Sequence, residues 1–300
     1  MRNIVHVSDL HFGHNDRSLL EPLRKAIFRL DPQLVIVSGD LVEHATVREF
    51  EDARDFLATL PKPQLVVPGN HDLPFYNLFE RAFIGLGRYK KFITPDTSPQ
   101  FQDDQMAVIG ANTSRIWPLR GGSLSATQLA RLETQFAALP ENLVRILVTH
   151  HPFDLPEGQN SRLIVGHARR SIAGLAPVTD ILLAGHIHLS SSGSTAARYK
   201  TSGHSLAFVQ AGTCVSNRNK GENNSFNFLR AGLGSTGDKV AVVERYSWDK
   251  HSQDFTRQDR VEYTLASEGW AKCVPDHEAE VTALQNETDN MRSTDTGRSP

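Results

Sequence analysis

Short apolar runs alternate with amphipathic segments along the chain, and this alternation is the feature that most restricts the folds it can adopt. The apolar runs predict nine strands: "NIVHVS", "QLVIVSG", "QLVVPG", "MAVIGA", "VRILVTH", "DILLAGH", "LAFVQAG", "FNFLRA" and "KVAVVERY". Several are β-branched and apolar on both faces, which is typical of strands in the middle of a sheet. The chain is therefore predicted to be α/β, with two or more layers of sheet and no internal repeat.

Three amphipathic segments between these runs predict helices. The first has apolar residues at helical spacing, namely Leu19, Leu20, Leu23, Ile27 and Leu30. The second follows a Thr46/Glu49 capping box and repeats the pattern with Phe50, Ala53, Phe56, Leu57 and Leu60. The third starts at Ser125, with Gln128 in the capping position.

Composition limits the class of protein. With 300 residues and 39% hydrophobic residues, the chain can form one large or two modest domains with a full core. The formal net charge is -2 and no stretch is strongly basic, so nucleic acid is not the expected partner. The two cysteines and the lack of a secretory or membrane-spanning apolar run predict the cytoplasm.

The apolar periodicity ends near Ala266. The last residues, "QNETDNMRSTDTGRSP", are polar and show no helical or strand pattern. We therefore predict one domain over residues 1–265 and a disordered tail over 266–300, and we expect function to survive removal of the tail.

Five polar motifs follow predicted strands, in the order "DLH", "GD", "GNHD", "THHP" and "GHIH". The residues that they contribute are Asp9, His11, Asp40, Asn70, His71, Asp72, His150, His186 and His188. Any one motif is weak, because a histidine at a strand end commonly just bonds a nearby carbonyl group. Together they indicate a site, because open α/β sheets bind ligands at one edge, beyond the carboxyl ends of their strands.

The spacing within these motifs suits metal ions. In extended chain, the two polar residues of DLH and of GHIH point the same way, about 6 to 7 Å apart. Carboxylates and imidazoles are ligands for Zn, Mn and Fe, so the metal identity stays open. Two-metal hydrolases hold their ions about 3.5 to 4 Å apart, which requires a bridging group, and Asp40 is the natural bridge.

The GNHD motif combines a ligand with a substrate-facing group. On its own, Gly, Asn and Asp would indicate only a turn. In extended backbone Asn70 and His71 project to opposite sides, so Asn70 can bind metal through its amide oxygen while His71 faces the substrate. We predict His71 as a general acid, Asp72 as the residue that orients it, and Gly69 as the point of a sharp turn.

The ordered set of motifs resembles the calcineurin-like metallophosphoesterase superfamily over roughly the first 190 residues. The later segment "AGTCVSNRNKGENNSFNFL" resembles one found in bacterial cyclic-nucleotide phosphodiesterase-like members. The resemblance implies a four-layer αββα sandwich of two mixed β-sheets flanked by helices. It also implies two divalent or mixed-valence metal ions, drawn from Mn, Fe, Zn and Co.

The resemblance further assigns the ligands by motif position. It implies a first metal ion held by Asp9, His11, Asp40 and His188. The second ion would be held by Asp40, Asn70, His150 and His186, with His71 near the phosphate. His150 is preferred to His151 as the ligand because Pro152 fixes the frame of the HxP motif.

Departures from the family pattern narrow the chemistry. Purple acid phosphatases place a tyrosine three residues after the bridging Asp, whereas this chain has Glu43, so a charge-transfer Fe(III) site is not expected. The GDxVDRG motif of protein phosphatases is absent, and the motif histidine is not replaced by the arginine of some lipid-precursor hydrolases.

Charge favours a phosphodiester substrate. Two divalent ions and two carboxylates give about +2, and a bridging hydroxide lowers this to about +1. We predict a phosphodiesterase for small organic or cyclic phosphodiesters, in which metal-bound hydroxide attacks phosphorus. A phosphomonoesterase or nuclease with the same metal centre is the alternative, and a non-catalytic scaffold is the third reading.

Further predictions concern residues outside the five motifs. In the segment after GNHD, we predict that Phe79, Phe83 and Ile84 are core and that the substrate wall is formed by Phe75, Tyr76, Arg81, Arg88 and Lys90. In the later segment, three residues either line the pocket or belong to a turn, namely Thr213, Arg218 and Asn224. His6 is expected to be a core histidine, Cys214 a small buried hydrophobe, and the chain can form a homo-oligomer.

Overall fold

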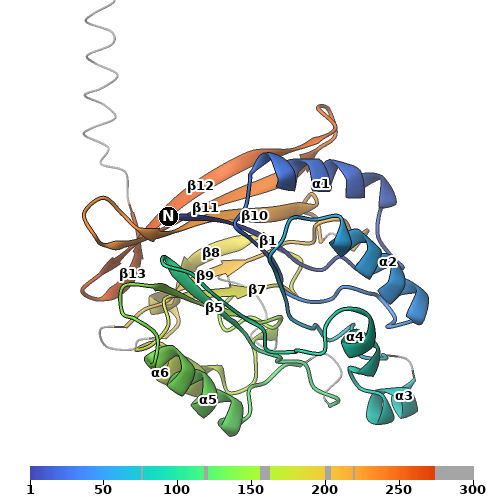
Figure 1. Cartoon of the computed structure of the whole chain (residues 1–300), viewed down its shortest axis with the longest axis horizontal. Coiled ribbons are helices and arrows are strands. Elements are labelled where there is room, and N and C mark those ends of the chain that lie inside the picture. The colour runs from blue at the N-terminus through green and yellow to red at the C-terminus, as the bar shows by residue number, and fades with distance from the viewer. Residues whose placement is uncertain (76, 118–120, 156–162, 200–203, 219, 274–300) are drawn as a thin grey trace, which may run out of the picture.

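A computed structural model of the chain describes residues 1–75, 77–117, 121–155, 163–199, 204–218 and 220–273. Its strands form two stacked mixed sheets (Figure 1). The seven-stranded sheet has the order β13-β12-β11-β10-β1-β2-β3 and the six-stranded sheet the order β4-β5-β6-β7-β9-β8. In the first, β1, β2 and β3 are parallel, and in the second β5, β6, β7 and β9 are parallel.

The strands of the seven-stranded sheet are β1 (Arg2–Val7), β2 (Leu34–Val37), β3 (Gln64–Val66), β10 (Ser225–Leu233), β11 (Lys239–Asp249), β12 (Asp254–Ala266) and β13 (Gly269–Lys272). Those of the six-stranded sheet are β4 (Gln100–Gln102), β5 (Met106–Gly110), β6 (Val144–Val148), β7 (Ile181–Ala184), β8 (Ser191–Ser194) and β9 (Ala207–Gln210). The helices are η1 (Arg17–Leu19), α1 (Leu20–Arg29), α2 (Val47–Ala58), α3 (Leu78–Phe83), α4 (Gly87–Phe92), α5 (Ala126–Ala137), α6 (Ala168–Leu175) and η3 (Thr195–Ala197).

Side-chain alternation along the buried strands builds the layers. In β2, Leu34 and Ile36 join the core between the two sheets, whereas Val35 and Val37 join the core on the outer face. Successive side chains of a strand point to opposite faces, so a strand that is apolar throughout must be covered on both sides. The continuous apolar runs in the sequence therefore indicate sheets with two buried faces.

Helices cover those outer faces. Helices α1 and α2 pack on the seven-stranded sheet, and α5 and α6 pack on the six-stranded sheet, so the strands lie between two helical layers (Figure 1). This confirms the predicted four-layer αββα arrangement. Both predicted capping boxes are present, at Thr46 with Glu49 and at Ser125 with Gln128. In the described ranges, no helix combines the length and apolarity that a membrane crossing requires.

All nine predicted strands are present, and four others lie at or near the sheet edges. Strand β12 escaped prediction because its segment "DFTRQDRVEYTLA" has four consecutive exposed polar residues at 257–260, which interrupt the apolar pattern. Strand β13 continues the sheet beyond residue 265, the predicted domain end: Trp270 is buried and its Nε1 donates to Asp180 Oδ1 at 3.2 Å. Residues 274–300, most of the predicted tail, lie outside the described residues.

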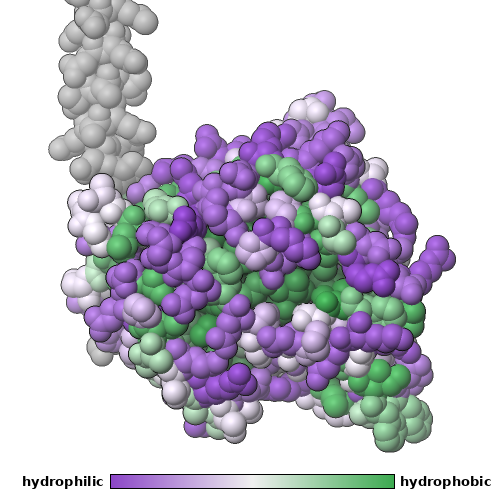
Figure 2. Space-filling model, in the orientation of Figure 1, coloured by the Kyte–Doolittle hydropathy of each residue, from purple (hydrophilic) through white to green (hydrophobic). Residues whose placement is uncertain are grey.

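The segment after GNHD differs from its prediction. Phe79 and Phe83 of α3 are 79% and 85% exposed, and Ile84 is 40% exposed, so the prediction that they are core is wrong. Figure 2 shows hydrophobic residues gathered at the lower right, over α3. The helix instead anchors through Arg81, which is fully buried and donates to the carbonyl oxygens of Ile116 and Arg115 at 2.8 and 2.9 Å. A polar side chain, not the apolar ones, fixes this short helix.

Candidate metal centre

The five polar motifs meet at one end of the two sheets. Asp9 and His11 follow β1, Asp40 follows β2, and Asn70 and His71 follow β3. From the second sheet, His150 follows β6, and His186 and His188 follow β7. The strands within each sheet are parallel here, so their carboxyl ends share an edge, as predicted.

The backbone at these residues is not extended, contrary to the premise of the sequence prediction. Positive φ angles occur at Asp9 (55°), His11 (47°), Asp40 (51°), His186 (78°) and His188 (59°). A non-glycine residue in this region costs about 1 kcal/mol or more, and such strain concentrates at functional sites. The left-handed backbone turns the side chains inward, and Asp9 Oδ1 lies only 3.7 Å from His11 Nε2.

Two glycines allow the strand ends to approach each other. A Cβ atom on Gly39, where φ is +96°, would lie 2.7 Å from Gly69 N and 2.8 Å from His150 Nδ1. A Cβ atom on Gly69 would overlap Asp40, although Gly69 itself has no positive φ. The chain turns directly after Gly69, at residues 70–72, and the lack of a side chain is required by close packing against Asp40 and not by a left-handed backbone.

The first group of donor atoms surrounds Asp9. His11 Nε2 lies 3.1 Å from His188 Nε2, and His188 Nε2 lies 3.2 Å from Asp9 Oδ1. Each histidine presents its other nitrogen to an acceptor: His11 Nδ1 lies 2.8 Å from Glu43 Oε2, and His188 Nδ1 lies 2.9 Å from the Arg218 carbonyl oxygen. With Nδ1 of His188 as the donor, its Nε2 presents a lone pair to the group, and the Glu43 carboxylate beside His11 Nδ1 favours the same tautomer for His11.

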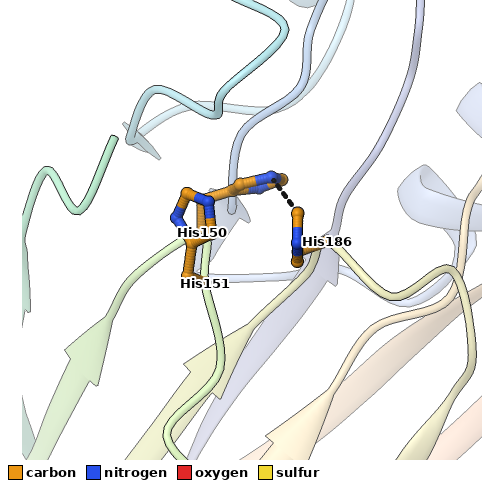
Figure 3. Close-up of side chains that lie close together, drawn as sticks. All are labelled: His150, His151 and His186. Carbon is orange, nitrogen blue, oxygen red and sulfur yellow. Dashed lines mark hydrogen bonds between the residues drawn. The ribbon is translucent and has the colours of Figure 1, made fainter. Parts of the chain in front are cut away.

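The second group of donor atoms surrounds His150. His150 Nε2 lies 3.2 Å from Asn70 Oδ1, 3.2 Å from Asp40 Oδ2 and 3.3 Å from His186 Nδ1. Figure 3 shows the rings of His150 and His186 turned toward each other, with His151 beside them. His150 Nδ1 donates to the Ser38 carbonyl oxygen at 2.8 Å, and this contact leaves Nε2 directed at the group.

Asp40 belongs to both groups. Its Oδ2 lies 3.2 Å from His150 Nε2 and 3.8 Å from His11 Nε2, while its Oδ1 accepts from the backbone N–H of His71 at 2.8 Å. Asp9 is held in the same way, since its Oδ2 accepts from the backbone N–H of His186 at 3.0 Å. Each carboxylate thus has one anchored oxygen and one directed into the donor groups.

These donor sets fit two metal ions. Donor atoms about 2.0 to 2.2 Å from one ion lie about 2.9 to 3.6 Å from each other. The contacts of His188 Nε2 with His11 and Asp9, and those of His150 Nε2 with Asn70, Asp40 and His186, fall in this range, whereas His11 Nε2 lies slightly farther from Asp9 and Asp40, at 3.7 and 3.8 Å. Asp9 Oδ1 is buried and has no hydrogen-bond partner among the described residues. A buried carboxylate oxygen facing imidazole lone pairs is unfavourable unless a cation lies between them. We therefore conclude that the residues present are suited to hold metal.

Charge around the ligands agrees with this fit. Burial raises the pKa of Asp40, but His150, His71 and His11 outweigh it and hold the pKa below its usual range. Burial lowers the pKa of His150, but Asp40 and Asp9 outweigh it and raise the pKa to about 9. The buried carboxylates thus favour positive charge at this position, and a metal ion that binds here would compete with protons for the same donor atoms.

The structure separates His71 from Asp72. The Asp72 carboxylate is buried and accepts from the backbone N–H groups of Leu41 at 2.9 Å and Gly69 at 2.7 Å. The prediction that Asp72 orients His71 is wrong, because His71 Nδ1 instead donates to the Glu43 carbonyl oxygen at 2.9 Å. Asp72 thus links the segment after β2, which carries Asp40, to the segment after β3, which carries Asn70. Burial raises the pKa of its carboxyl group.

Glu43 is the residue that the sequence prediction missed. Its carboxylate contacts His11 Nδ1, its carbonyl oxygen accepts from His71, and Arg218 donates to both of its carboxylate oxygens at 3.0 and 3.2 Å. Its place three residues after Asp40 was visible in the sequence. Nothing in the spacing showed that it would face the motif histidines.

The donor groups open into a cleft of about 240 Å³. Its lining residues are Asp40, Asn70, His71, Leu163, His186, His188, Arg218 and Lys220. Burial lowers the pKa of His71, and the ring of Phe75 stacks on it with centroids 5.7 Å apart. Phe75 thus contacts His71 but is not among the lining residues of the cleft, so its place in a substrate wall stays a prediction, and Tyr76 lies outside the described residues.

Four other residues that were named as candidates for the substrate site have side chains that contact protein groups. Arg81 is buried against backbone carbonyl groups, so the prediction that it forms part of a substrate wall is wrong. Arg88 pairs with Glu80 at 2.8 Å. Thr213 Oγ1 donates to the Asp9 carbonyl oxygen at 2.7 Å, and Asn224 Nδ2 donates to the Ser216 carbonyl oxygen at 2.9 Å. Both stabilise the loop beside the site.

The remaining predictions concern two core residues, His6 and Cys214, and one residue of the predicted substrate wall, Lys90. His6 is buried, with Nε2 2.9 Å from Ser38 Oγ, and Cys214 is buried, with Sγ accepting from the backbone N–H of Ser8 at 3.4 Å. Both are core residues as predicted. Lys90 is exposed on α4 and is absent from the residues that line the cleft.

Sequence comparisons identify relatives with known names. The chain is 28% identical over 179 residues to the 3',5'-cyclic adenosine monophosphate phosphodiesterase CpdA of Escherichia coli (strain K12), a match that covers 57% of this chain and 59% of that protein. It is 27% identical over 199 residues to a probable glycerophosphodiester phosphodiesterase, GpdQ, of Arcobacter nitrofigilis, covering 62% of this chain and 71% of that one. The similarity therefore spans about three fifths of the chain.

Comparison with solved structures supports the fold. A purple acid phosphatase from yellow lupin superposes with a TM-score of 0.64 at 12% identity, covering 87% of this chain and 53% of that one. The family described as calcineurin-like phosphoesterase matches residues 2–190, more than half of the 300 residues and all five polar motifs. On this match and this fold, the chain belongs to the calcineurin-like phosphoesterase family.

Proposed function

We propose that the protein is a binuclear metal-dependent phosphodiesterase that hydrolyses small organic or cyclic phosphodiesters. The observation that carries the proposal is the position of Asp40 Oδ2, which is shared by the donor group around Asp9 and the donor group around His150. One carboxylate oxygen within reach of two sets of ligands is the arrangement of two-metal hydrolases.

We assign the ligands of the two ions from the two donor groups. Asp9, His11, Asp40 and His188 would hold one ion, and Asp40, Asn70, His150 and His186 the other. When bound, the metal ions supply positive charge for the phosphate oxygens and lower the pKa of water so that it can act as the nucleophile. The cleft of about 240 Å³ suits a small ester, and its cationic lining suits a phosphodiester monoanion.

His71 completes the substrate side of the site. The predicted role as a general acid requires a proton on Nε2, and this role stays a prediction. The contacts support another role: Nδ1 donates to the Glu43 carbonyl oxygen, so in the neutral ring Nε2 is an acceptor, and Arg218 lies 3.2 Å from it. We propose that His71 acts in this neutral form.

The metal identity, location and assembly are also proposals. Four histidines, two carboxylates and one amide are compatible with Mn, Fe, Zn or Co. Glu43 occupies the position of the purple acid phosphatase tyrosine, which supports a site without a charge-transfer Fe(III) ion. The free cysteines Cys214 and Cys273 support a cytoplasmic location, and a homo-oligomer stays an untested prediction.

Substrate preference tests the proposed reaction. We expect metal-replete protein to hydrolyse bis(p-nitrophenyl) phosphate with a kcat/KM at least about tenfold above that for p-nitrophenyl phosphate, a difference of about 1.4 kcal/mol. The measurement is then extended to cyclic AMP, glycerophosphodiesters and DNA. A preference for the monoester would indicate a phosphomonoesterase, and a preference for DNA would indicate a nuclease. No hydrolysis of any of them would favour the scaffold reading.

A further inference from the structure

Arg218 places a guanidinium group at the mouth of the metal centre. Its NH1 atom lies 3.0 and 3.2 Å from the two Glu43 carboxylate oxygens and 3.2 Å from His71 Nε2. The side chain is 39% exposed and lines the cleft beside Asp40 and His188. It therefore reaches both the protein anchors and the space in which a substrate would lie.

The position of Arg218 is fixed at both its backbone and its side chain. The backbone N–H donates to Ser216 Oγ at 3.0 Å, and the carbonyl oxygen accepts from His188 Nδ1 at 2.9 Å. Glu43, which holds the guanidinium, is itself buried and contacts His11 Nδ1 at 2.8 Å. Because these anchors tie Arg218 to two metal ligands, its guanidinium is positioned relative to the metal centre before substrate binds.

The anchors use only part of the guanidinium. All three side-chain contacts involve NH1, and Nε and NH2 have no hydrogen-bond partner within the described ranges. Arg81 is a useful contrast, because its Nε, NH1 and NH2 all donate to backbone carbonyl groups. Nε and NH2 form one edge of the planar fork, which matches two oxygens of a phosphate group.

The direction of the hydrogen bonds of His71 indicates that Arg218, and not His71, presents N–H donors to a substrate at this end of the cleft. His71 Nδ1 donates to a carbonyl oxygen, so its Nε2 accepts from Arg218 and the ring offers the substrate no N–H there. Lys220, two residues later, is exposed and lines the same cleft but has no contact with Glu43 or His71 among the described residues. Of the described residues that line the cleft, Arg218 alone combines a positive charge held by other side chains with donors that are not used by those anchors.

On the assumption that the proposed phosphodiesterase function is right, we propose that Arg218 is a substrate-binding residue that contacts the phosphate of the diester through Nε and NH2. Glu43 and His71 are positioning residues that hold NH1. The contact adds charge-assisted hydrogen bonds to the phosphate on the side of Asp9, His11 and His188. It favours anionic phosphodiesters whose ester groups are small enough to let the phosphate oxygens reach Arg218 at the cleft wall.

The test compares Arg218→Ala and Arg218→Lys in the metal-replete protein. Substitution leaves the Arg218 carbonyl oxygen in place, so the contact with His188 is retained and metal content should match the wild type. We expect Arg218→Ala to lower kcat/KM for bis(p-nitrophenyl) phosphate by about 10- to 100-fold and to weaken orthophosphate binding by a similar factor. Arg218→Lys should recover only part of each loss, and added guanidinium should raise the activity of Arg218→Ala.

Lys250→Met is the control, because it removes one positive charge from an exposed turn between β11 and β12, away from the cleft. It should change kcat/KM and orthophosphate affinity by less than about twofold. An Arg218→Ala variant that matches this control in both measurements would overturn the inference, as would a loss of metal, which would indicate a role in holding His188. If the wild type cleaves no phosphodiester, the proposed function fails, and the orthophosphate titration still decides whether Arg218 binds phosphate.

Discussion

Asp40→Asn is expected to remove more activity than any other single substitution at the site. The shared Oδ2 atom lies 3.2 Å from His150 Nε2 and 3.8 Å from His11 Nε2, so the change affects both donor groups. Loss of residues that merely support metal ligands costs about 10- to 100-fold. We therefore expect a loss of more than about 100-fold in kcat/KM, together with less than the normal metal content measured by elemental analysis.

Asp180→Asn is a matched control for this substitution. Asp180 is also a buried carboxylate, but it lies directly before β7, outside the donor groups. It accepts from Trp270 Nε1 and forms an ion pair with Lys239. The control should retain its metal and its activity per folded molecule, even if it unfolds at a lower temperature. An Asp40→Asn protein with normal metal content and near-normal turnover would show that Asp40 does not bridge the two groups.

His71→Ala is expected to keep both metal ions and to lower kcat by up to about 100-fold, the upper end of the loss expected when Arg218 no longer contacts the phosphate. His71 is absent from both donor groups, and its Nε2 holds Arg218 while Phe75 stacks on its ring. His71→Gln supplies an amide oxygen that can accept from Arg218 without carrying a titratable proton. If His71 acts as an acceptor, His71→Gln should recover about tenfold of the loss.

The two roles for His71 give different outcomes in the same experiment. Glutamine cannot act as a general acid. If His71 has that role, His71→Gln would be as impaired as His71→Ala, and both variants would lose the alkaline limb of the pH profile of kcat. That pair of results would contradict the acceptor role and support the sequence prediction instead. A fall in metal content in either variant would show that His71 is a ligand.

The strands and the ligand motifs could be predicted from sequence because each depends on local pattern. Apolar runs such as "QLVIVSG" require two covered faces, and parallel strands bring their ends together wherever the helices lie. The predicted ligands Asp9, His11, Asp40 and His150 could thus be placed at one edge without coordinates. The two capping boxes were equally local and equally readable.

Other features depended on contacts between distant segments. The left-handed backbone at His186 and His188 could not be inferred, since spacing arguments assume extended chain. Glu43 gained its role from His11, His71 and Arg218, and Arg218 lies 175 residues away. Arg81 was wrongly predicted to form part of a substrate wall, because its burial depends on the distant carbonyl groups of Arg115 and Ile116. In each case tertiary packing decided the outcome.

A metal titration of the stripped protein tests the central claim most directly. Protein freed of metal and checked by elemental analysis is titrated with Mn(II), Co(II), Zn(II) or Fe(II), while bound metal and bis(p-nitrophenyl) phosphate hydrolysis are measured on the same samples. We predict binding of about two ions per chain, no hydrolysis before metal is added, and a higher unfolding temperature as the ions bind. Full activity in the verified metal-free protein would contradict a binuclear metal-dependent hydrolase.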